Sequence, residues 1–175
     1  MRQVAPRHHN ALLRCFAYLS ILVFFPSLAS ADTVELEPND SLETAQSISL
    51  DDSIVGTISS SSDVDVFAVS ASSAGTLTVA MTTKDISSWS SYGFAYVVTD
   101  ASGNTLAADS CTDSCSSLTV GLSAAGTYYV AVGSSSSYGA PDGSYTVTAS
   151  YSTDTSGVEL EPNDSLETAQ SISLD

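Results

Sequence analysis

The chain has 175 residues, enough for one domain with extensions, and carries 20 acidic but only four basic side chains, for a net charge of −16. Three of the four basic residues precede position 32, so that residues 32–175 keep Lys84 alone and a net charge of −19. Such a surface repels phosphates, which excludes nucleic acid as a partner.

Residues 1–31 have the features of a secretory signal peptide. A basic start precedes a largely apolar stretch at residues 15–28, and Ala29-Ser30-Ala31 has the small-x-small pattern of a cleavage site. The apolar stretch is shorter than the ~20 residues that a membrane span needs, so we expect no stable membrane insertion after its removal. The mature protein is therefore expected to begin at Asp32 and to be secreted, either into the medium or to the cell surface.

An 18-residue segment occurs twice without a single difference, at residues 34–51 and at residues 158–175. The copies begin 124 residues apart, a period that fits one domain rather than a solenoid repeat. We therefore expect a domain at 32–151, a linker at 152–157 and the truncated start of a second repeat after it. The alternative is that the second copy docks on a neighbouring molecule as the first copy does on its own, building head-to-tail chains.

Each copy opens with oxygen-bearing side chains around a proline. In the first copy, Pro38 keeps the preceding residue extended. Alternation along an extended segment then points Glu35, Glu37 and Asn39 the same way, and Asp40 follows where the chain turns. Four oxygen-bearing side chains thus converge within six residues of sequence.

A second acidic pair, Asp63 and Asp65, stands at the entry to a later strand, again with a spacing of two. Calcium takes about six to eight oxygen ligands, and the six side chains of both segments, with five negative charges, suit this ion. The plainer interpretations are a solvated acidic face or a helix cap in the first segment and a polar turn in the second. The second copy ends without a following acidic pair, so only the first copy is expected to form a complete site.

Short runs with period-two alternation follow, with apolar residues on one face and mostly Ser or Thr on the other. The expected strands are 54–58, 65–69, 75–81, 94–98, 106–109, 118–122, 126–132 and 143–151. Asp100 to Asn104 is expected to form a turn. About eight strands at this spacing predict an all-β sandwich. The only helical candidate is residues 41–47, where Asp40 and Glu43 form a plausible capping box.

Two pairs of residues in the later part of the chain are candidates for a disulfide and for a ligand-binding site. Cys111 and Cys115 are close in sequence, and in an oxidising compartment this predicts a disulfide that pins a loop, with two free thiols as the alternative. Trp89 and Tyr92 flank two serines in a predicted loop and form a candidate ligand-binding pair for sugars or extended peptides. Ordinary packing at the end of the sandwich is the alternative for these aromatic residues.

Several motifs resemble the bacterial pre-peptidase C-terminal domain family, which includes the collagen-binding modules of clostridial collagenases. The motifs are the opening Glu-x-Glu-Pro-Asn-Asp-Ser, the Asp-x-Asp-x-Phe from Asp63 to Phe67, and Gly-x-Tyr-x-Val in the strands at 126–130 and 143–147. The resemblance extends over residues 34–151. It implies a jelly-roll-like antiparallel β-sandwich without catalytic activity, which accompanies a secreted peptidase or another exported protein.

The resemblance also implies a metal, because some members of that family bind calcium through these two acidic segments. Carried over by position, the ligands are Glu35, Glu37, Asn39, Asp40 and Asp65, together with Asp63 where the loop spacing allows. We therefore expect a calcium-stabilised, non-catalytic module that targets, spaces or stabilises a secreted protein. No peptidase domain is attached to this chain, which leaves the partner open.

Two other functions compete with this interpretation. One is an adhesive module that binds an extracellular polymer, such as a polysaccharide or a collagen-like chain. The other is a hydrolase that uses a pair of carboxylates, the one catalytic chemistry left to residues 32–175. These residues contain no histidine, which excludes a Ser-His-Asp or Cys-His arrangement and histidine-ligated zinc.

Overall fold

The computed structural model describes residues 32–87, 92–155 and 158–163, together with the single positions 165, 167, 169 and 171. The predicted signal peptide at 1–31 and Trp89 lie outside the described residues. In the described part of the chain, no helix has the length and apolar character that crossing a membrane requires. The described residues instead form eleven strands.

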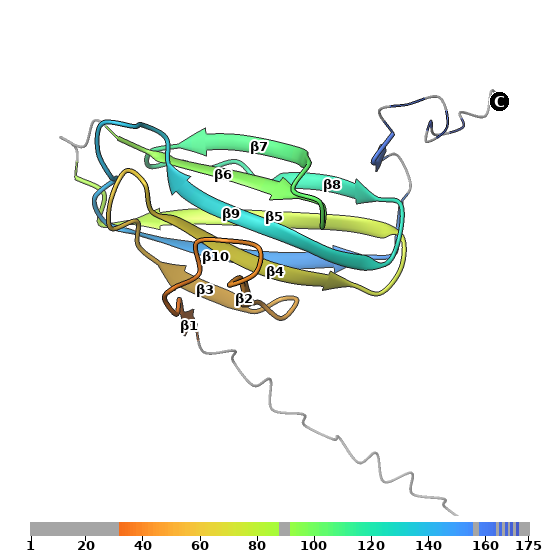
Figure 1. Cartoon of the computed structure of the whole chain (residues 1–175), viewed down its shortest axis with the longest axis horizontal. Helices are drawn as coiled ribbons and strands as arrows, with labels where there is room; N and C mark the ends of the chain where they lie inside the picture. The colour runs from red at the N-terminus through yellow and green to blue at the C-terminus, as the bar shows by residue number, and fades with distance from the viewer. Residues whose placement is uncertain are drawn as a thin grey trace, which may run out of the picture.

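The strands form two sheets that pack face to face (Figure 1). The first sheet has six strands in the order β1 (Thr33–Val34), β3 (Ser53–Gly56), β10 (Ser144–Ser152), β5 (Gly75–Lys84), β8 (Leu118–Leu122) and β11 (Leu160–Glu161). The second sheet has five strands in the order β2 (Gln46–Ser47), β4 (Val64–Ala71), β9 (Gly126–Ser134), β6 (Phe94–Thr99) and β7 (Thr105–Cys111).

The eight longer strands, β3 to β10, pair antiparallel with one another. Early strands lie beside late ones, β3 with β10 and β4 with β9, which is the arrangement of an eight-stranded jelly roll. The predicted all-β sandwich is thereby confirmed. The sheets are mixed rather than wholly antiparallel, because the two-residue strands β1, β2 and β11 join their neighbours in parallel.

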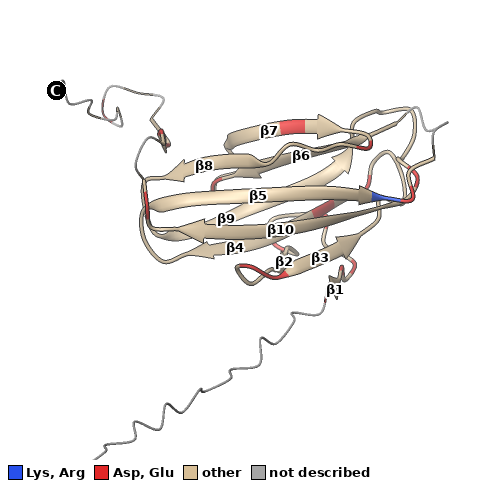
Figure 2. Ribbon diagram, turned by 180° about the vertical axis from the view of Figure 1, so that it is seen from behind, with Lys and Arg blue, Asp and Glu red and all other residues tan. Residues whose placement is uncertain are grey.

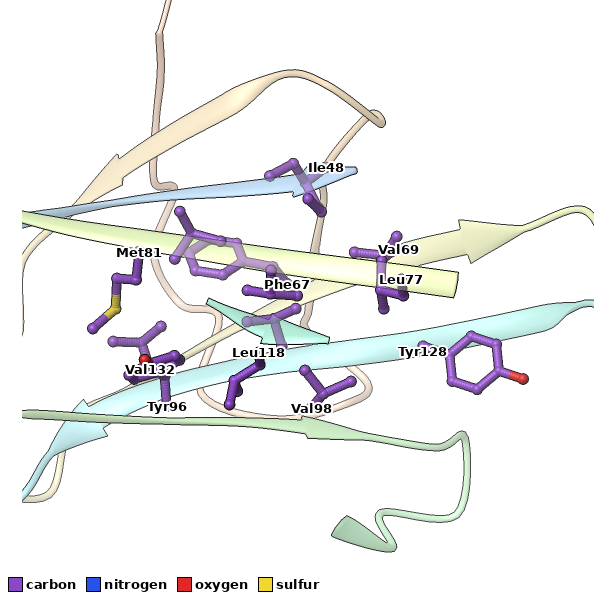
Figure 3. Close-up of a cluster of buried hydrophobic side chains, with 14 of the residues drawn as sticks. Ile48, Phe67, Val69, Leu77, Met81, Tyr96, Val98, Leu118, Tyr128 and Val132 are labelled. Atoms are coloured by element: carbon purple, nitrogen blue, oxygen red, sulfur yellow. The ribbon is translucent and has the colours of Figure 1, made fainter. Parts of the chain in front are cut away.

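The core lies between the sheets and follows the alternation of the sequence (Figure 3). Three aromatic rings fill the part near β3, with the ring centroid of Tyr145 lying 6.4 Å from that of Phe67 and 5.6 Å from that of Phe94. Each fully buried large side chain contributes about 1.5–3 kcal/mol. Tyr145 is fully buried, and its hydroxyl therefore needs a polar partner inside the protein, which the first copy of the repeated segment supplies.

The helix expected at residues 41–47 is wrong. Ser41 and Thr44 instead close a single turn, in which the Thr44 N–H donates to the Ser41 carbonyl at 3.1 Å. The next residues, Gln46–Ser47, pair with β4, and Ile48 enters the core with 6% of its surface exposed. A helix as short as the predicted one is unstable without docking, and burial of Ile48 on an extended chain outweighs it.

Loops at the ends of the sandwich hold most of the charge (Figure 2). The predicted Asp100–Asn104 turn is present, and the Asp100 carboxylate accepts hydrogen bonds from the N–H groups of Ser102 and Asn104. The Asn104 side-chain amide also donates to this carboxylate and is the main reason that the pKa of Asp100 is lowered. Cys111 and Cys115 are joined by a disulfide, with their Cα atoms 5.0 Å apart.

Candidate cation site

The first copy of the repeated segment lies along the edge of β3. The Glu35 N–H donates to the Val55 carbonyl at 3.0 Å, which continues the parallel pairing of β1. The Glu35 carboxylate then accepts from the Thr57 N–H at 2.8 Å and from the Tyr145 hydroxyl at 3.1 Å. Backbone pairing thus carries this carboxylate from an edge strand to the buried hydroxyl of β10.

The close approach of the Glu35 carboxylate to the Tyr145 hydroxyl depends on a glycine. A Cβ atom at Gly56 would lie 2.3 Å from the Tyr145 hydroxyl and 2.4 Å from a Glu35 carboxylate oxygen. Both distances are below any real contact, so Gly56 is the residue that lets Glu35 and Tyr145 meet.

Three carboxylates gather here, since Glu35, Glu37 and Asp65 each place an oxygen within 4.8 Å of the other two. Two negative charges at that separation repel each other by roughly 3 kcal/mol in the partly screened environment of a protein surface. No basic residue is near in sequence, because Lys84 is the only one after position 31. A cation or a proton would relieve this repulsion.

Among the three carboxylates, Asp65 has the least favourable environment for a negative charge. It is fully buried, one of its oxygens accepts from the Tyr145 hydroxyl, and its other oxygen has no partner. Burial raises the pKa of Asp65 to about 8, and the neighbouring carboxylates of Glu35 and Asp63 act in the same direction. The pKa of Tyr145 is also raised, chiefly by burial and next by Asp65, so that this phenol remains a neutral donor.

Asn39 is also fully buried, and neither atom of its side-chain amide has a hydrogen-bond partner. Its backbone is fixed on both sides, because its N–H donates to Glu37 at 2.9 Å and its carbonyl accepts from the Val66 N–H at 3.0 Å. A buried amide left in this state costs about 1–3 kcal/mol. Among the described residues, three of the four buried polar side-chain atoms without a partner belong to Asn39 and Asp65.

The two remaining predicted ligands stand apart from this arrangement. Asp63 is 8% exposed and uses a carboxylate oxygen to accept from the Ser59 N–H, which closes the loop before β4. It therefore acts on the cluster through its charge on Asp65. Asp40 is exposed and does not belong to the group of three carboxylates. The structure thus brings together Glu35, Glu37 and Asp65.

Sequence reasoning missed two residues of the site, Tyr145 and Gly56. The alternation of the last long strand identifies Tyr145 as a core residue, and nothing near it in the sequence indicates that its hydroxyl meets carboxylates. It lies 110 residues after Glu35. Only the pairing of β3 with β10, which places Tyr145 directly opposite Gly56, brings them to the cluster.

The second copy repeats part of the local geometry of the first copy. The Asn163 N–H donates to the Glu161 carboxylate at 3.1 Å, as the Asn39 N–H does to Glu37, and the Glu–Pro bond is cis in both copies. The Asn163 amide, however, donates to Glu159 at 2.7 Å and so has a partner. Among the described residues, the only group of three candidate metal-ligating side chains joins Glu35 and Glu37 of the first copy to Asp65 of β4.

The candidate ligand-binding pair is only half described. Trp89 lies outside the described residues. Tyr92 is half-buried and packs closely on Gly139, where a Cβ atom would lie 2.4 Å from its ring. Tyr138, one residue earlier, is 88% exposed.

The comparisons with known proteins concern the fold. No protein-family model matches the sequence, and no curated protein matches it either. Among solved structures, the chain is similar to the pre-peptidase C-terminal domain of collagenase from Bacillus anthracis, with 18% identity over 60% of this chain and 93% of that one and a TM-score of 0.44. It is also similar to PliG of Aeromonas hydrophila, a periplasmic inhibitor of g-type lysozyme, with 13% identity over 70% of this chain and 100% of that one and a TM-score of 0.44. A domain of the family that the sequence motifs resemble is thus among the solved structures to which this chain is similar.

Proposed function

We propose that this protein is a non-catalytic exported module that binds calcium and serves to target, space or stabilise a secreted protein. The observation that supports the proposal is that two buried side chains of the predicted ligand set have polar atoms without a partner, namely both atoms of the Asn39 amide and one oxygen of Asp65. Native proteins seldom leave such atoms without partners, and when they do, a bound ion is one of the ordinary explanations.

The ligand chemistry favours calcium among metal ions. The three clustered carboxylates, with the Asn39 amide oxygen as a further candidate, offer hard oxygen ligands and no nitrogen or sulfur, which suits calcium or magnesium rather than zinc or copper. Calcium accepts six to eight oxygens in irregular geometry, so that backbone carbonyls and water can complete its shell. Magnesium demands a regular octahedron and keeps most of its water, which fits poorly with ligands as confined as Asn39 and Asp65.

Bound calcium would fasten the N-terminal segment to the sandwich. Glu35 and Glu37 come from the edge segment, and Asp65 comes from β4 in the other sheet. An ion shared among them links the two sheets where β1 would otherwise fray. Binding to the folded state alone adds about 2.7 kcal/mol to the free energy of unfolding when the free ion stands at 100 times its dissociation constant.

The test compares thermal melts of the exported chain in calcium and in chelator, with calorimetric titration of calcium. We expect a higher midpoint in calcium for the wild type and for Glu43→Gln, a matched control that removes an exposed carboxylate of the same segment. Asp65→Asn should abolish both the shift and the titration signal. An equal midpoint in both buffers, with no heat of binding, would refute calcium binding.

The accessory role has its own test. Residues 32–175 hold neither histidine nor arginine, and the carboxylates brought together in the structure are assigned to the ion. We expect the purified chain to show no hydrolytic activity on protein or polysaccharide and to be recovered with a secreted peptidase or another exported protein.

The competing function is polymer binding through exposed aromatic side chains, for which Tyr138 is the candidate among the described residues. Retention on polysaccharide or collagen beads that is lost on Tyr138→Ala or Trp89→Ala would favour that function instead.

A further inference from the structure

The two outer strands of the six-stranded sheet both include residues of the repeated segment. β1, at the start of the first copy, closes one edge by pairing with β3, and β11, from the second copy, closes the other edge by pairing with β8. Both pairings are parallel. Residues of the same repeated segment therefore lie at both edges of this sheet.

The two copies use different residues to do so. The first copy pairs with β3 through Val34, together with Thr33 just before it. The second copy pairs with β8 through Leu160 and Glu161, and the equivalents of these residues in the first copy are Leu36 and Glu37, which belong to no strand of the structure. In the first copy these two residues pair with no strand, because the Leu36 N–H donates to the Gln46 side chain at 2.7 Å and Glu37 joins the carboxylate cluster.

The first copy exposes two apolar side chains. Leu36 is 69% exposed and Val34 is 66% exposed, and among the described residues only Tyr138 shares this property with them as a large hydrophobic side chain. Their equivalents in the second copy, Val158 and Leu160, are half-buried at the β8 edge. The same two side chains are therefore covered in one copy and uncovered in the other.

The β8 edge is shaped to accept this segment. Gly121 pairs with Leu160, and a Cβ atom at Gly121 would lie 1.8 Å from the Glu159 carbonyl oxygen, so that any other residue would push the segment away. The Ser123 N–H donates to the Glu161 carbonyl at 3.0 Å and completes the pairing. Recognition here is strand addition to a sheet edge, in which backbone bonds give affinity and side chains select the sequence.

We propose that the β8 edge is a binding site for the Val-Glu-Leu-Glu segment, filled by the protein's own second copy and open, once that copy leaves, to residues Val34–Glu37 of a second molecule. The contact joins two different surfaces, one at each side of the sandwich, so it repeats head to tail and does not close. The tethered second copy competes at a high effective concentration, which keeps the wild-type protein monomeric. The incoming segment includes Glu35 and Glu37 and must leave the carboxylate cluster of its own molecule, so a cation bound there opposes the assembly.

Two substitutions release the second copy with opposite consequences for assembly. Leu160→Ser removes the apolar contact of the second copy and leaves the β8 edge intact for another molecule. Gly121→Ala also displaces the second copy, because the new Cβ meets its backbone, but it blocks a second molecule in the same way. The atoms in conflict at Gly121 belong to the second copy, so the sandwich itself has no reason to unfold. Leu36→Ser, added to Leu160→Ser, removes the incoming apolar contact.

The experiment is sedimentation velocity over a range of concentrations, in about 0.3 M salt to screen the negative charge of the chain and with a chelator to keep the carboxylate cluster free of divalent cations. We expect faster-sedimenting species that grow with concentration for Leu160→Ser, and a concentration-independent monomer for the wild type, for Gly121→Ala and for the Leu36→Ser/Leu160→Ser double variant. Hydrogen exchange at the Ser123 amide reports occupation of the edge. Its protection should be lost in Gly121→Ala at all concentrations and regained in Leu160→Ser as the chains form.

Any of three results would overturn the proposal. One is a Leu160→Ser protein that loses Ser123 protection yet stays monomeric up to its solubility limit, since the edge would then be open without attracting a second molecule. Another is equal association of Gly121→Ala and Leu160→Ser, which would place the contact elsewhere. Retained protection of Ser123 in both variants would show that the second copy does not hold the edge as described.

Discussion

The buried carboxyl of Asp65 predicts an unusual dependence of stability on pH when no metal is bound. An unfolded chain has an ordinary Asp pKa near 3.8, whereas the folded protein raises the pKa of Asp65 to about 8, mainly through burial. Between these values the folded state holds a proton that the unfolded state has lost. The free energy of unfolding in chelator should therefore fall by about 1.4 kcal/mol for each pH unit from about 4 to about 8, roughly 5 kcal/mol at most in total.

Calcium should reverse this trend, because the ion binds the ionised carboxylate and competes with the proton. The difference between the unfolding free energies in calcium and in chelator should widen as the pH rises from 5 to 8. Urea unfolding at half-unit pH steps over this range measures both curves, and it stays above the region where ordinary carboxylates such as Asp100 titrate. Asp65→Asn is the matched control, since it keeps the shape of the side chain without the ionisable proton.

The control should flatten the pH profile in chelator and abolish the gain from calcium. A wild-type profile in chelator that is as flat as that of the variant would refute the reasoning, because Asp65 would then ionise in the folded protein without cost. A profile that rises with pH would refute it more directly, since this is the behaviour of a carboxyl group whose pKa is lowered by folding.

Three further outcomes test other parts of the structure. Gly56→Ala should lower the free energy of unfolding by about 1–3 kcal/mol and abolish calcium binding, because its Cβ would displace Glu35; calorimetry and urea unfolding measure the two effects. Asn39→Ala should weaken calcium binding by titration yet leave the stability in chelator unchanged or improved, because it removes a buried amide that has no partner. Replacing Cys111 and Cys115 by serine should lower the free energy of unfolding by about 2 kcal/mol or less, since the disulfide closes a very short loop. A much larger decrease, measured by urea unfolding, would show that the disulfide does more than pin the loop.

The fold could be predicted from the sequence because each long strand carries its own signal. In the last strand, Tyr145, Val147 and Ala149 alternate with serine and threonine, and the structure buries all three of these residues. The three two-residue strands carry no such signal. They form because a neighbouring edge offers backbone partners, and pairing of that kind depends on tertiary contacts rather than on local pattern.

The acidic half of the candidate site could also be found in the sequence, since the spacing of Glu35 and Glu37 places both carboxylates on one side of an extended segment. The other residues of the site could not be predicted from the sequence. Which of several nearby acids enters the cluster depends on the path of the loop before β4, and there Asp63 turns back to Ser59 while Asp65 points inward. Tyr145 and Gly56 enter only through a pairing between β3 and β10, which no local pattern specifies.

The site draws on both ends of the domain, because Glu35 stands at its start and Tyr145, which bonds to it, lies 110 residues later in the last long strand. Folding of this topology is slow, since β3 and β4 wait for partners that are synthesised last. Before β10 is in place, Tyr145 is absent from the carboxylate cluster and the site is incomplete. Calcium therefore finds its complete site only once β10 is in place, and we expect it to slow the unfolding of the finished protein more than it changes the folding rate.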